Sequence, residues 1–282
     1  MTMARTYPAG VTSWVDLEVA DLGALDVATR FYGDLLGWTF QPATRDEAPF
    51  RYLVARLDGQ DAAGLGGPAS PDRPGGTEWT TYIAVDDTDA TAAAVARAGG
   101  QVLLPPADAG EGGRSALCAD PDGLRFGLFQ ARRRLGAQVT NQPGAWNFSD
   151  LHTADPEGAP AFYTALFGWE VSDLGFARMI RRPGYGDHLE ATVDPGIRER
   201  QSGAMVPPGF ADAIGWVAPL APDEAAHWHV TFSVADRDDA AATAERLGGT
   251  VIRSSTSDWT REAVVADPLG AQFTVSQFTP PG

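Results

Sequence analysis

The eight-residue stretch FYGDLLGW at residues 31–38 returns as FYTALFGW at residues 162–169. Other segments pair in the same order along the two halves of the chain: WVDLEVAD at 14–21 with FSDLHTAD at 148–155, WTTYIAVDD at 79–87 with WHVTFSVAD at 228–236, and ADPDGLRFGLFQ at 119–130 with ADPLGAQFTVSQ at 266–277. Because the order is kept over nearly the whole length, the sequence indicates a duplicated domain.

Each half divides again into two similar units. Residues 14–21 alternate between apolar and polar side chains, which predicts a half-buried strand. The next segment predicts a helix that Asp21 caps and Gly37 ends. A second strand and an alanine-rich helix follow, and a D-P-x-G turn joins the last two strands. The sequence therefore predicts an α+β protein of four βαβββ units.

The segment 136–145 joins the two halves. We therefore expect a first domain at residues 1–135, with units at about 11–68 and 78–130, and a second at 146–282, with units at about 146–206 and 226–278. The segment 204–222 is rich in proline, glycine and alanine, so we expect it to be loop-like.

Composition narrows the class of partner. The formal net charge is −16, and such a surface repels nucleic acid. Cys118 is the only cysteine, which excludes an intrachain disulfide. We see neither a signal peptide nor a run of about 18 apolar residues, so we expect a cytoplasmic protein that does not bind membranes, as a monomer or homodimer with a small-molecule ligand.

The FY-x-x-L-x-GW stretch and the D-P-x-G turn together resemble the vicinal oxygen chelate superfamily. That superfamily includes glyoxalase I, bleomycin-resistance proteins, fosfomycin-resistance enzymes and extradiol dioxygenases. The duplicated form is similar to a two-domain actinobacterial glyoxalase-like subgroup. The resemblance implies that the units pair into two curved-sheet or barrel domains with open clefts.

The resemblance also implies where a metal would bind. Most of these families hold one divalent metal through His, Glu or Gln on the first and last strands of each unit. Those positions fall here on Trp14, Thr80, Phe148 and His229, on Gly127 and Thr274, and near Gly64 and Gly203. Because His229 alone is of a ligand type, we expect no cofactor at the inherited site. The alternative is one divalent metal in a displaced site of His152, His229 and Glu190.

All four histidines of the chain lie in its second half. Asp150 and His152 share one face of a predicted strand, and His229 lies on the first strand of the next unit. We expect these three residues to be catalytic, with Asp150 and His152 as an acid/base pair. His188 and Glu190 form a second predicted same-face pair. The competing interpretation is that the histidines are bonded to neighbours in a cleft wall or loop.

The remaining cleft positions predict a site for an organic ligand, because polar groups between flat apolar walls are typical of small-ligand pockets. We expect Arg125 to bind the ligand or to pair with Asp16 or Glu18. The predicted substrate-binding residues are Trp14, Asp16, Glu18, Tyr82, Arg125, Phe148 and Thr274.

Three functions remain open from the sequence. The favoured one is metal-independent acid/base chemistry, of the lyase or isomerase type, on a small aromatic or carbonyl-bearing molecule in the second domain. The alternative is a resistance protein that sequesters a drug or metabolite without chemistry. A further alternative is a metal-dependent lyase or dioxygenase with displaced ligands.

Overall fold

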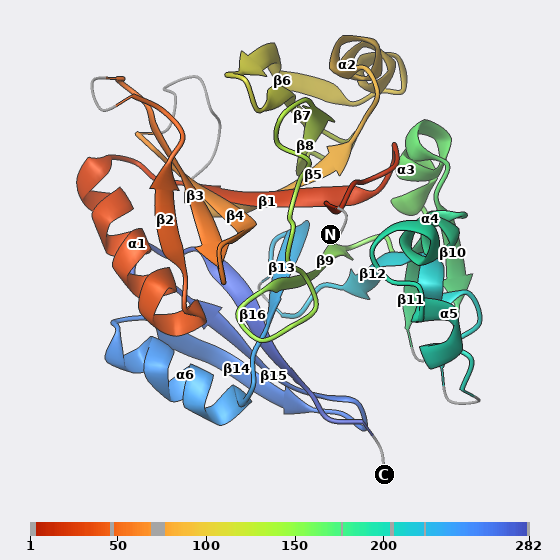
Figure 1. The fold of residues 1–282 in the computed structure, drawn as a ribbon. Helices are drawn as coiled ribbons and strands as arrows, with labels where there is room; N and C mark the ends of the chain where they lie inside the picture. The colour runs from red at the N-terminus through yellow and green to blue at the C-terminus, as the bar shows by residue number, and fades with distance from the viewer. Residues whose placement is uncertain are drawn as a thin grey trace. The chain divides into compact units, whose positions relative to one another are not determined.

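The computed structural model describes residues 4–45, 48–68, 77–175, 177–203, 206–222 and 224–280 (Figure 1). It contains the four predicted βαβββ units. The first is β1 (Thr12–Glu18), α1 (Leu22–Leu36), β2 (Thr39–Pro42), β3 (Arg51–Leu57) and β4 (Gln60–Gly67). The second is β5 (Glu78–Ala84), α2 (Thr88–Arg97), β6 (Gln101–Ala109), β7 (Gly113–Ala119) and β8 (Arg125–Ala131).

The second half repeats this order with an insertion. The third unit is β9 (Trp146–Thr153), α3 (Pro160–Phe167), β10 (Glu170–Asp173), β11 (Arg178–Arg181) and β12 (Ala213–Pro219), with α4 (Tyr185–Thr192), α5 (Ile197–Arg200) and a 3₁₀ helix, η1 (Phe210–Asp212), before its last strand. The fourth is β13 (His227–Ser233), α6 (Arg237–Arg246), β14 (Thr250–Thr256), β15 (Thr260–Ala266) and β16 (Gln272–Phe278).

Each half of the chain forms one mixed eight-stranded sheet. The first has the order β2-β3-β4-β1-β5-β8-β7-β6, and the second has the equivalent order β10-β11-β12-β9-β13-β16-β15-β14. The first and last strands of each unit pair in parallel, as β1 does with β4 and β13 with β16. The first strands of successive units are also neighbours, so β9 and β13 lie together at the centre of the second sheet.

Local signals in the sequence account for the first helix. The Asp21 side chain accepts a hydrogen bond from Ala24 N at 2.8 Å, which satisfies a backbone donor at the start of α1. Gly37 ends the helix at φ 75°, in the left-handed region that glycine tolerates without strain. Leu25, Phe31, Tyr32 and Leu36 form the buried face of α1. The predicted cap residues are confirmed.

The third unit departs from the sequence-based expectation. We expected its last strand near Gly203 and a loop over 204–222, but β12 lies at Ala213–Pro219, inside that segment. The unit therefore extends well beyond residue 206. The inserted helices separate β12 from the rest of its unit in sequence, so regular spacing between strands failed as a guide. Gly64 does lie on β4, opposite Asp16 of β1.

The chain forms two compact units, and each contains parts of both halves. One comprises Met1–Ser13, Thr81–Gly136 and Ser149–Trp228, and the other comprises Trp14–Thr80, Ala137–Phe148 and His229–Gly282. Each sheet is formed by one half of the chain, on one side of the linker. By contrast, one compact unit combines most of the second and third βαβββ units, and the other combines most of the first and fourth. The proposed domain boundary at 136–145 stays a prediction.

The repeated stretch packs each compact unit together. In one unit, Tyr32 donates a hydrogen bond to Asp267 Oδ2 and accepts one from Trp79 Nε1, both at 3.0 Å. In the other, Tyr163 donates to Asp120 Oδ2 and accepts from Trp228 Nε1, also both at 3.0 Å. Trp38 and Trp169, at the ends of the two stretches, stack on Tyr32 and Tyr163. Each stretch thus joins a helix of one half to a D-P-x-G turn of the other.

Within the described residues, every helix is too short or too polar to cross a lipid bilayer.

Candidate metal centre and active site

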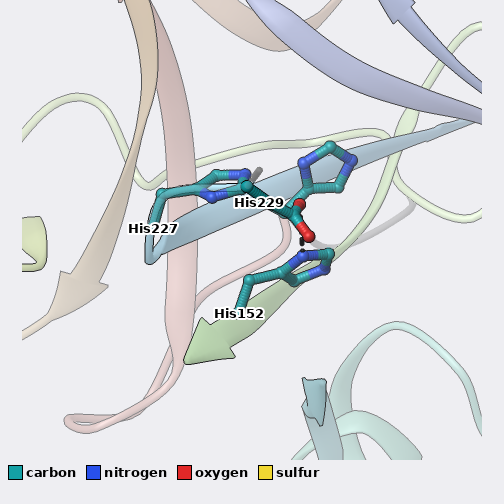
Figure 2. A group of neighbouring side chains, drawn as sticks. His152, His227 and His229 are labelled. Atoms are coloured by element: carbon teal, nitrogen blue, oxygen red, sulfur yellow. Dashed lines mark hydrogen bonds and ion pairs between the residues drawn. The ribbon is translucent and has the colours of Figure 1, made fainter. Parts of the chain in front are cut away.

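A group of three histidines and one glutamate lies at the centre of the second sheet. His152 comes from β9, His227 and His229 from the neighbouring β13, and Glu224 from the segment that precedes β13. One potential ligand atom from each residue lies within 4.8 Å of those of the other three. Figure 2 shows the three imidazoles as neighbours, with a dashed line between the His152 ring and a carboxylate. His227 and His229 share a face of β13 because side chains two positions apart in a strand point the same way.

Glu224 binds His152 directly. Its Oε1 lies 2.8 Å from His152 Nδ1, and its Oε2 accepts a hydrogen bond from Ala221 N at 2.7 Å. Burial acts to raise the pKa of Glu224, but the Ala221 N–H and the neighbouring His152 outweigh it, so this pKa is lowered from its ordinary value. Glu224 is therefore a carboxylate near neutral pH, and it orients the His152 ring.

The two histidines of β13 are also oriented by neighbours. His227 Nδ1 lies 2.8 Å from the carbonyl oxygen of Ala225, and since a carbonyl only accepts, Nδ1 carries the proton. The lone pair of a neutral His227 is then on Nε2. His229 Nε2 lies 2.8 Å from Thr274 Oγ1 of β16. His152 and His229 are only 7% and 3% exposed, so their rings are held in a largely dry environment.

The donor set suits a divalent transition metal. Imidazole nitrogens bind zinc, iron, nickel and copper well, whereas magnesium and calcium prefer sites made entirely of oxygen. Two donors on one ion lie at most about 4.2 Å apart when metal–nitrogen bonds are about 2.1 Å long. The donor atoms, which all lie within 4.8 Å of one another, are therefore spaced close to this limit. We conclude that these residues fit such a metal.

Two of the three predicted catalytic residues, His152 and His229, belong to this group. Asp150 lies on the same strand as His152, and its Oδ1 accepts a hydrogen bond from Trp216 N at 3.0 Å. The carboxylate bonded to His152 Nδ1 belongs to Glu224. The acid/base role assigned to Asp150 stays a prediction.

The pair of His188 and Glu190 does not share a face. Both residues lie on α4, where positions two apart are about 200° around the axis from one another. His188 Nε2 lies 3.1 Å from Thr6 Oγ1, and Glu190 forms an ion pair with Arg198 at 3.4 Å. Glu190 is not among the four clustered donors, and its predicted role as a metal ligand stays a prediction.

The predicted substrate-binding residues lie on the central strands, as expected, and their role stays a prediction. Trp14, Asp16 and Glu18 are on β1, Tyr82 on β5, Arg125 on β8, Phe148 on β9 and Thr274 on β16. Trp14 Nε1 donates to Tyr52 Oη at 2.9 Å, and Tyr52 donates to Asp16 Oδ2 at 3.1 Å. Two of the predicted substrate-binding residues, Trp14 and Asp16, are thus hydrogen-bonded to Tyr52.

Tyrosine rings occupy two positions of the first sheet where the resemblance placed metal ligands. A Cβ added at Gly64 would overlap the Tyr52 hydroxyl, and one added at Gly127 would overlap the Tyr82 ring. Thr80 stands where His229 stands in the second sheet. Within the residues that the structure describes, the donor group lies in the second sheet, and the choice of that half for the active site stays a prediction.

Sequence reasoning missed Glu224 and His227. Their signal is the run Glu224-x-x-His227-x-His229, which puts two imidazoles on one strand face and a carboxylate just before them. The glutamate lies outside any strand, so strand periodicity could not assign it. His227 lies two positions before His229, the family position, so the resemblance did not point to it.

Comparison with known proteins supports the fold and the duplication. Residues 148–276 match the family model described as "Glyoxalase-like domain", and residues 22–128 match "Glyoxalase/Bleomycin resistance protein/Dioxygenase superfamily". The chain is 35% identical to "Putative glyoxylase CFP32" of Mycobacterium tuberculosis (strain CDC 1551 / Oshkosh), over 99% of both chains. It is 32% identical to the anthracycline biosynthesis protein DauV of Streptomyces sp. (strain C5), over 98% of this chain and 96% of that protein.

Solved structures show the same fold at low identity. The Mn(II)-bound glyoxalase from Novosphingobium aromaticivorans matches with a TM-score of 0.58 and 17% identity, over 96% of this chain and 84% of that one. The 2,2',3-trihydroxybiphenyl 1,2-dioxygenase from Sphingomonas wittichii matches with a TM-score of 0.55 and 18% identity, over 96% and 90%. The two family models and the 35% identical relative, together with the four βαβββ units, show that the chain belongs to the glyoxalase/bleomycin resistance protein/dioxygenase superfamily.

Proposed function

We propose that this protein binds a small organic molecule beside the group of His152, Glu224, His227 and His229 and transforms it with the help of one divalent metal. The observation that carries the proposal is the convergence of four donor side chains within 4.8 Å at the centre of the second sheet. Three of these residues, His152, Glu224 and His227, do not occupy positions at which the superfamily resemblance implied metal ligands. The proposed site is therefore displaced from the inherited one.

Relatives support an organic substrate. DauV is named for anthracycline biosynthesis, and the fold is shared with a trihydroxybiphenyl dioxygenase and a glyoxalase. When bound, a divalent metal supplies a Lewis acid that polarises an oxygen of the substrate. The chain's own residues hold that centre: the imidazoles bind, Glu224 fixes the His152 ring, and burial of His152 and His229 limits the access of water.

One contact favours a second candidate, metal-independent acid/base chemistry. The hydrogen bond between His152 Nδ1 and Glu224 Oε1 is the arrangement of a general base and its orienting carboxylate. In that case His152 Nε2 would exchange a proton with the substrate. Both candidates place the reaction at His152 but differ in their need for a metal.

Elemental analysis separates the two candidates. We expect purified protein, loaded with Zn²⁺, Mn²⁺, Fe²⁺ or Ni²⁺ and desalted, to retain about one metal per chain by inductively coupled plasma mass spectrometry. His227→Ala should lose it, because a ligand is removed. His188→Ala is the matched control, since His188 lies on α4 outside the group, and it should keep the metal.

Failure of every metal to bind the wild-type protein would contradict the proposal. Turnover of carbonyl and catechol compounds that survives chelation, but is lost in His152→Ala, would then favour the acid/base candidate. Tight binding with unaltered ligand recovered would indicate sequestration instead.

A further inference from the structure

A cavity of about 190 Å³ lies beside the carboxyl ends of β5 and β8, two strands of the first sheet that pair in parallel. Residues 84–86 and 129–131 line it, together with Tyr7, Ser13 and Leu135. Every lining residue belongs to the same compact unit. Because the cavity is smaller than the roughly 300–1,000 Å³ of sites for drug-sized ligands, its occupant must be a molecule of fragment size.

The charge of the lining favours a cation. The structure describes all of the lining residues, and among them Asp86 is the one charged side chain. Asp86 is exposed, and it forms no hydrogen bond or ion pair with any other residue that the structure describes. Arg132 and Arg133, which follow the lining in sequence, pair with Asp108 and Glu111. A positively charged group in the cavity would therefore meet a carboxylate whose charge is not already matched.

Aromatic side chains supply the apolar part of the lining. Tyr7 and Phe129 both line the cavity. Burial raises the pKa of Tyr7 well above its ordinary value, so its hydroxyl stays neutral and adds no second negative charge. Aromatic rings attract organic cations as well as apolar groups. A carboxylate beside two such rings suits an ammonium or guanidinium group that is attached to a small apolar body.

The fourth βαβββ unit shows what the fold requires at this place. Its helix α6 begins as α2 does, since Gln277 Oε1 accepts a hydrogen bond from the first helical N–H at 3.1 Å and Gln130 Oε1 does so at 3.2 Å. Asp236 and Asp87 cap the two helices in the same way. Gln130 and Asp87 are thus accounted for by the helix start that the two units share.

Asp86 and Phe129 are not accounted for in this way. The residues that occupy their positions in the fourth unit are Ala235 and Ser276. The same local fold therefore forms without a carboxylate before the cap and without an aromatic ring at the end of the last strand. The two side chains that give the cavity its charge and part of its aromatic lining are additional to the structural requirement.

We propose that this cavity is a second binding site, which takes a small organic cation. Asp86 pairs with the ammonium or guanidinium group, and Tyr7 and Phe129 contact the apolar part of the molecule. None of the lining residues belongs to the histidine group of the second sheet. The proposal is therefore independent of the proposed function and needs no metal.

Nuclear magnetic resonance on the whole chain, labelled with ²H and ¹⁵N, tests the proposal with two probes. Benzylammonium carries a ring and a positive charge, and benzyl alcohol carries the same ring without the charge. Benzylammonium should shift the backbone amides of Val85, Asp86 and Gln130 in a saturable way. Benzyl alcohol should bind about 2- to 5-fold more weakly, which is the contribution of an exposed ion pair.

Variants assign the selectivity to the lining. Asp86→Asn should weaken benzylammonium binding by about 2- to 5-fold and leave benzyl alcohol binding unchanged. Phe129→Ser, which installs the residue of the fourth unit, should weaken benzylammonium binding by a similar factor of about 2 to 5. Asp34→Asn is the matched control, because Asp34 is an exposed carboxylate on α1, outside the cavity. Circular dichroism and thermal melts check that each variant folds.

Three results would overturn the proposal. The first is that neither probe shifts the amides of the lining in a saturable way. The second is that benzyl alcohol binds as tightly as benzylammonium, because the cavity would then not select a cation. The third is that Asp86→Asn changes benzylammonium binding no more than Asp34→Asn does, since the attraction would then come from the overall negative charge of the protein.

Discussion

Tyr32 donates a hydrogen bond to Asp267 Oδ2 at 3.0 Å across 235 positions of the chain, and Tyr163 repeats this bond with Asp120. Each tyrosine belongs to the repeated FY stretch, and each aspartate opens a D-P-x-G turn in the other half. The FY stretch and the D-P-x-G turn, the two motifs that carry the family resemblance, are therefore in direct contact. Their contacts lie within the compact units and bind repeats that are distant in sequence.

Removing one tyrosine hydroxyl should destabilise the protein. In Tyr32→Phe, Trp79 Nε1 and Asp267 Oδ2 lose a buried partner, and leaving such groups unsatisfied costs about 1–3 kcal/mol. Tyr163→Phe should behave in the same way. Urea denaturation measures the free energy of unfolding, with Val27→Ala on the exposed side of α1 as a control expected to change little. A Tyr32→Phe protein as stable as the wild type would show that this network contributes nothing.

Asp267 should make stability depend on pH in an unusual direction. Burial is the largest cause that raises its pKa above the ordinary 3.8. The pKa of Asp267 is higher in the folded protein than in the unfolded chain. The protonated carboxyl therefore contributes its full stabilisation at pH values below the unfolded-state pKa. That stabilisation is lost as the pH rises through the folded-state value. The Asp267→Asn side chain cannot ionise. As the pH is raised through the folded-state pKa of Asp267, the free energy of unfolding should therefore fall less in this variant than in the wild type. Denaturation at a series of pH values compares the two proteins, and parallel curves would disprove the effect.

Metal binding should weaken on acidification. A protonated imidazole cannot bind a metal, and the pKa of a free imidazole is about 6.5. Metal retained after dialysis should therefore decrease between about pH 7 and pH 5, and refilling at neutral pH should restore it. Circular dichroism at each pH separates loss of metal from unfolding. Metal content that is constant over this range in folded protein would argue against histidine ligands.

The glycine at position 127 should resist substitution. An added Cβ would overlap the ring of Tyr82, which is buried on β5, and overpacking of this kind costs about 1–3 kcal/mol. Gly127→Ala should therefore lower the free energy of unfolding, and it should cost less in a Tyr82→Ala background, where the ring that it overlaps is absent. Gly203→Ala is the matched control, because the nearest atom to its Cβ is 4.0 Å away. Additive effects of the two mutations would contradict the overlap.

Local physics made the four units predictable from sequence. Alternation between apolar and polar residues identified β1, and the cap residues Asp21 and Gly37 set the limits of α1, because each signal acts over only a few residues. The same reasoning misplaced β12. Its strand follows the inserted helices α4 and α5, so its distance from β11 carries no regular spacing.

Sequence by itself determined the four βαβββ units and the duplication, and it predicted His152 and His229 as site residues. Only the tertiary structure decided which repeats pack together and which carboxylate meets His152. Tyr32 and Asp267, like His152 and Glu224, are far apart in the chain, and their encounter depends on sheet register and on an irregular segment before β13. Periodicity describes a residue's own strand or helix and carries no information on what lies opposite it, so these contacts were beyond sequence analysis.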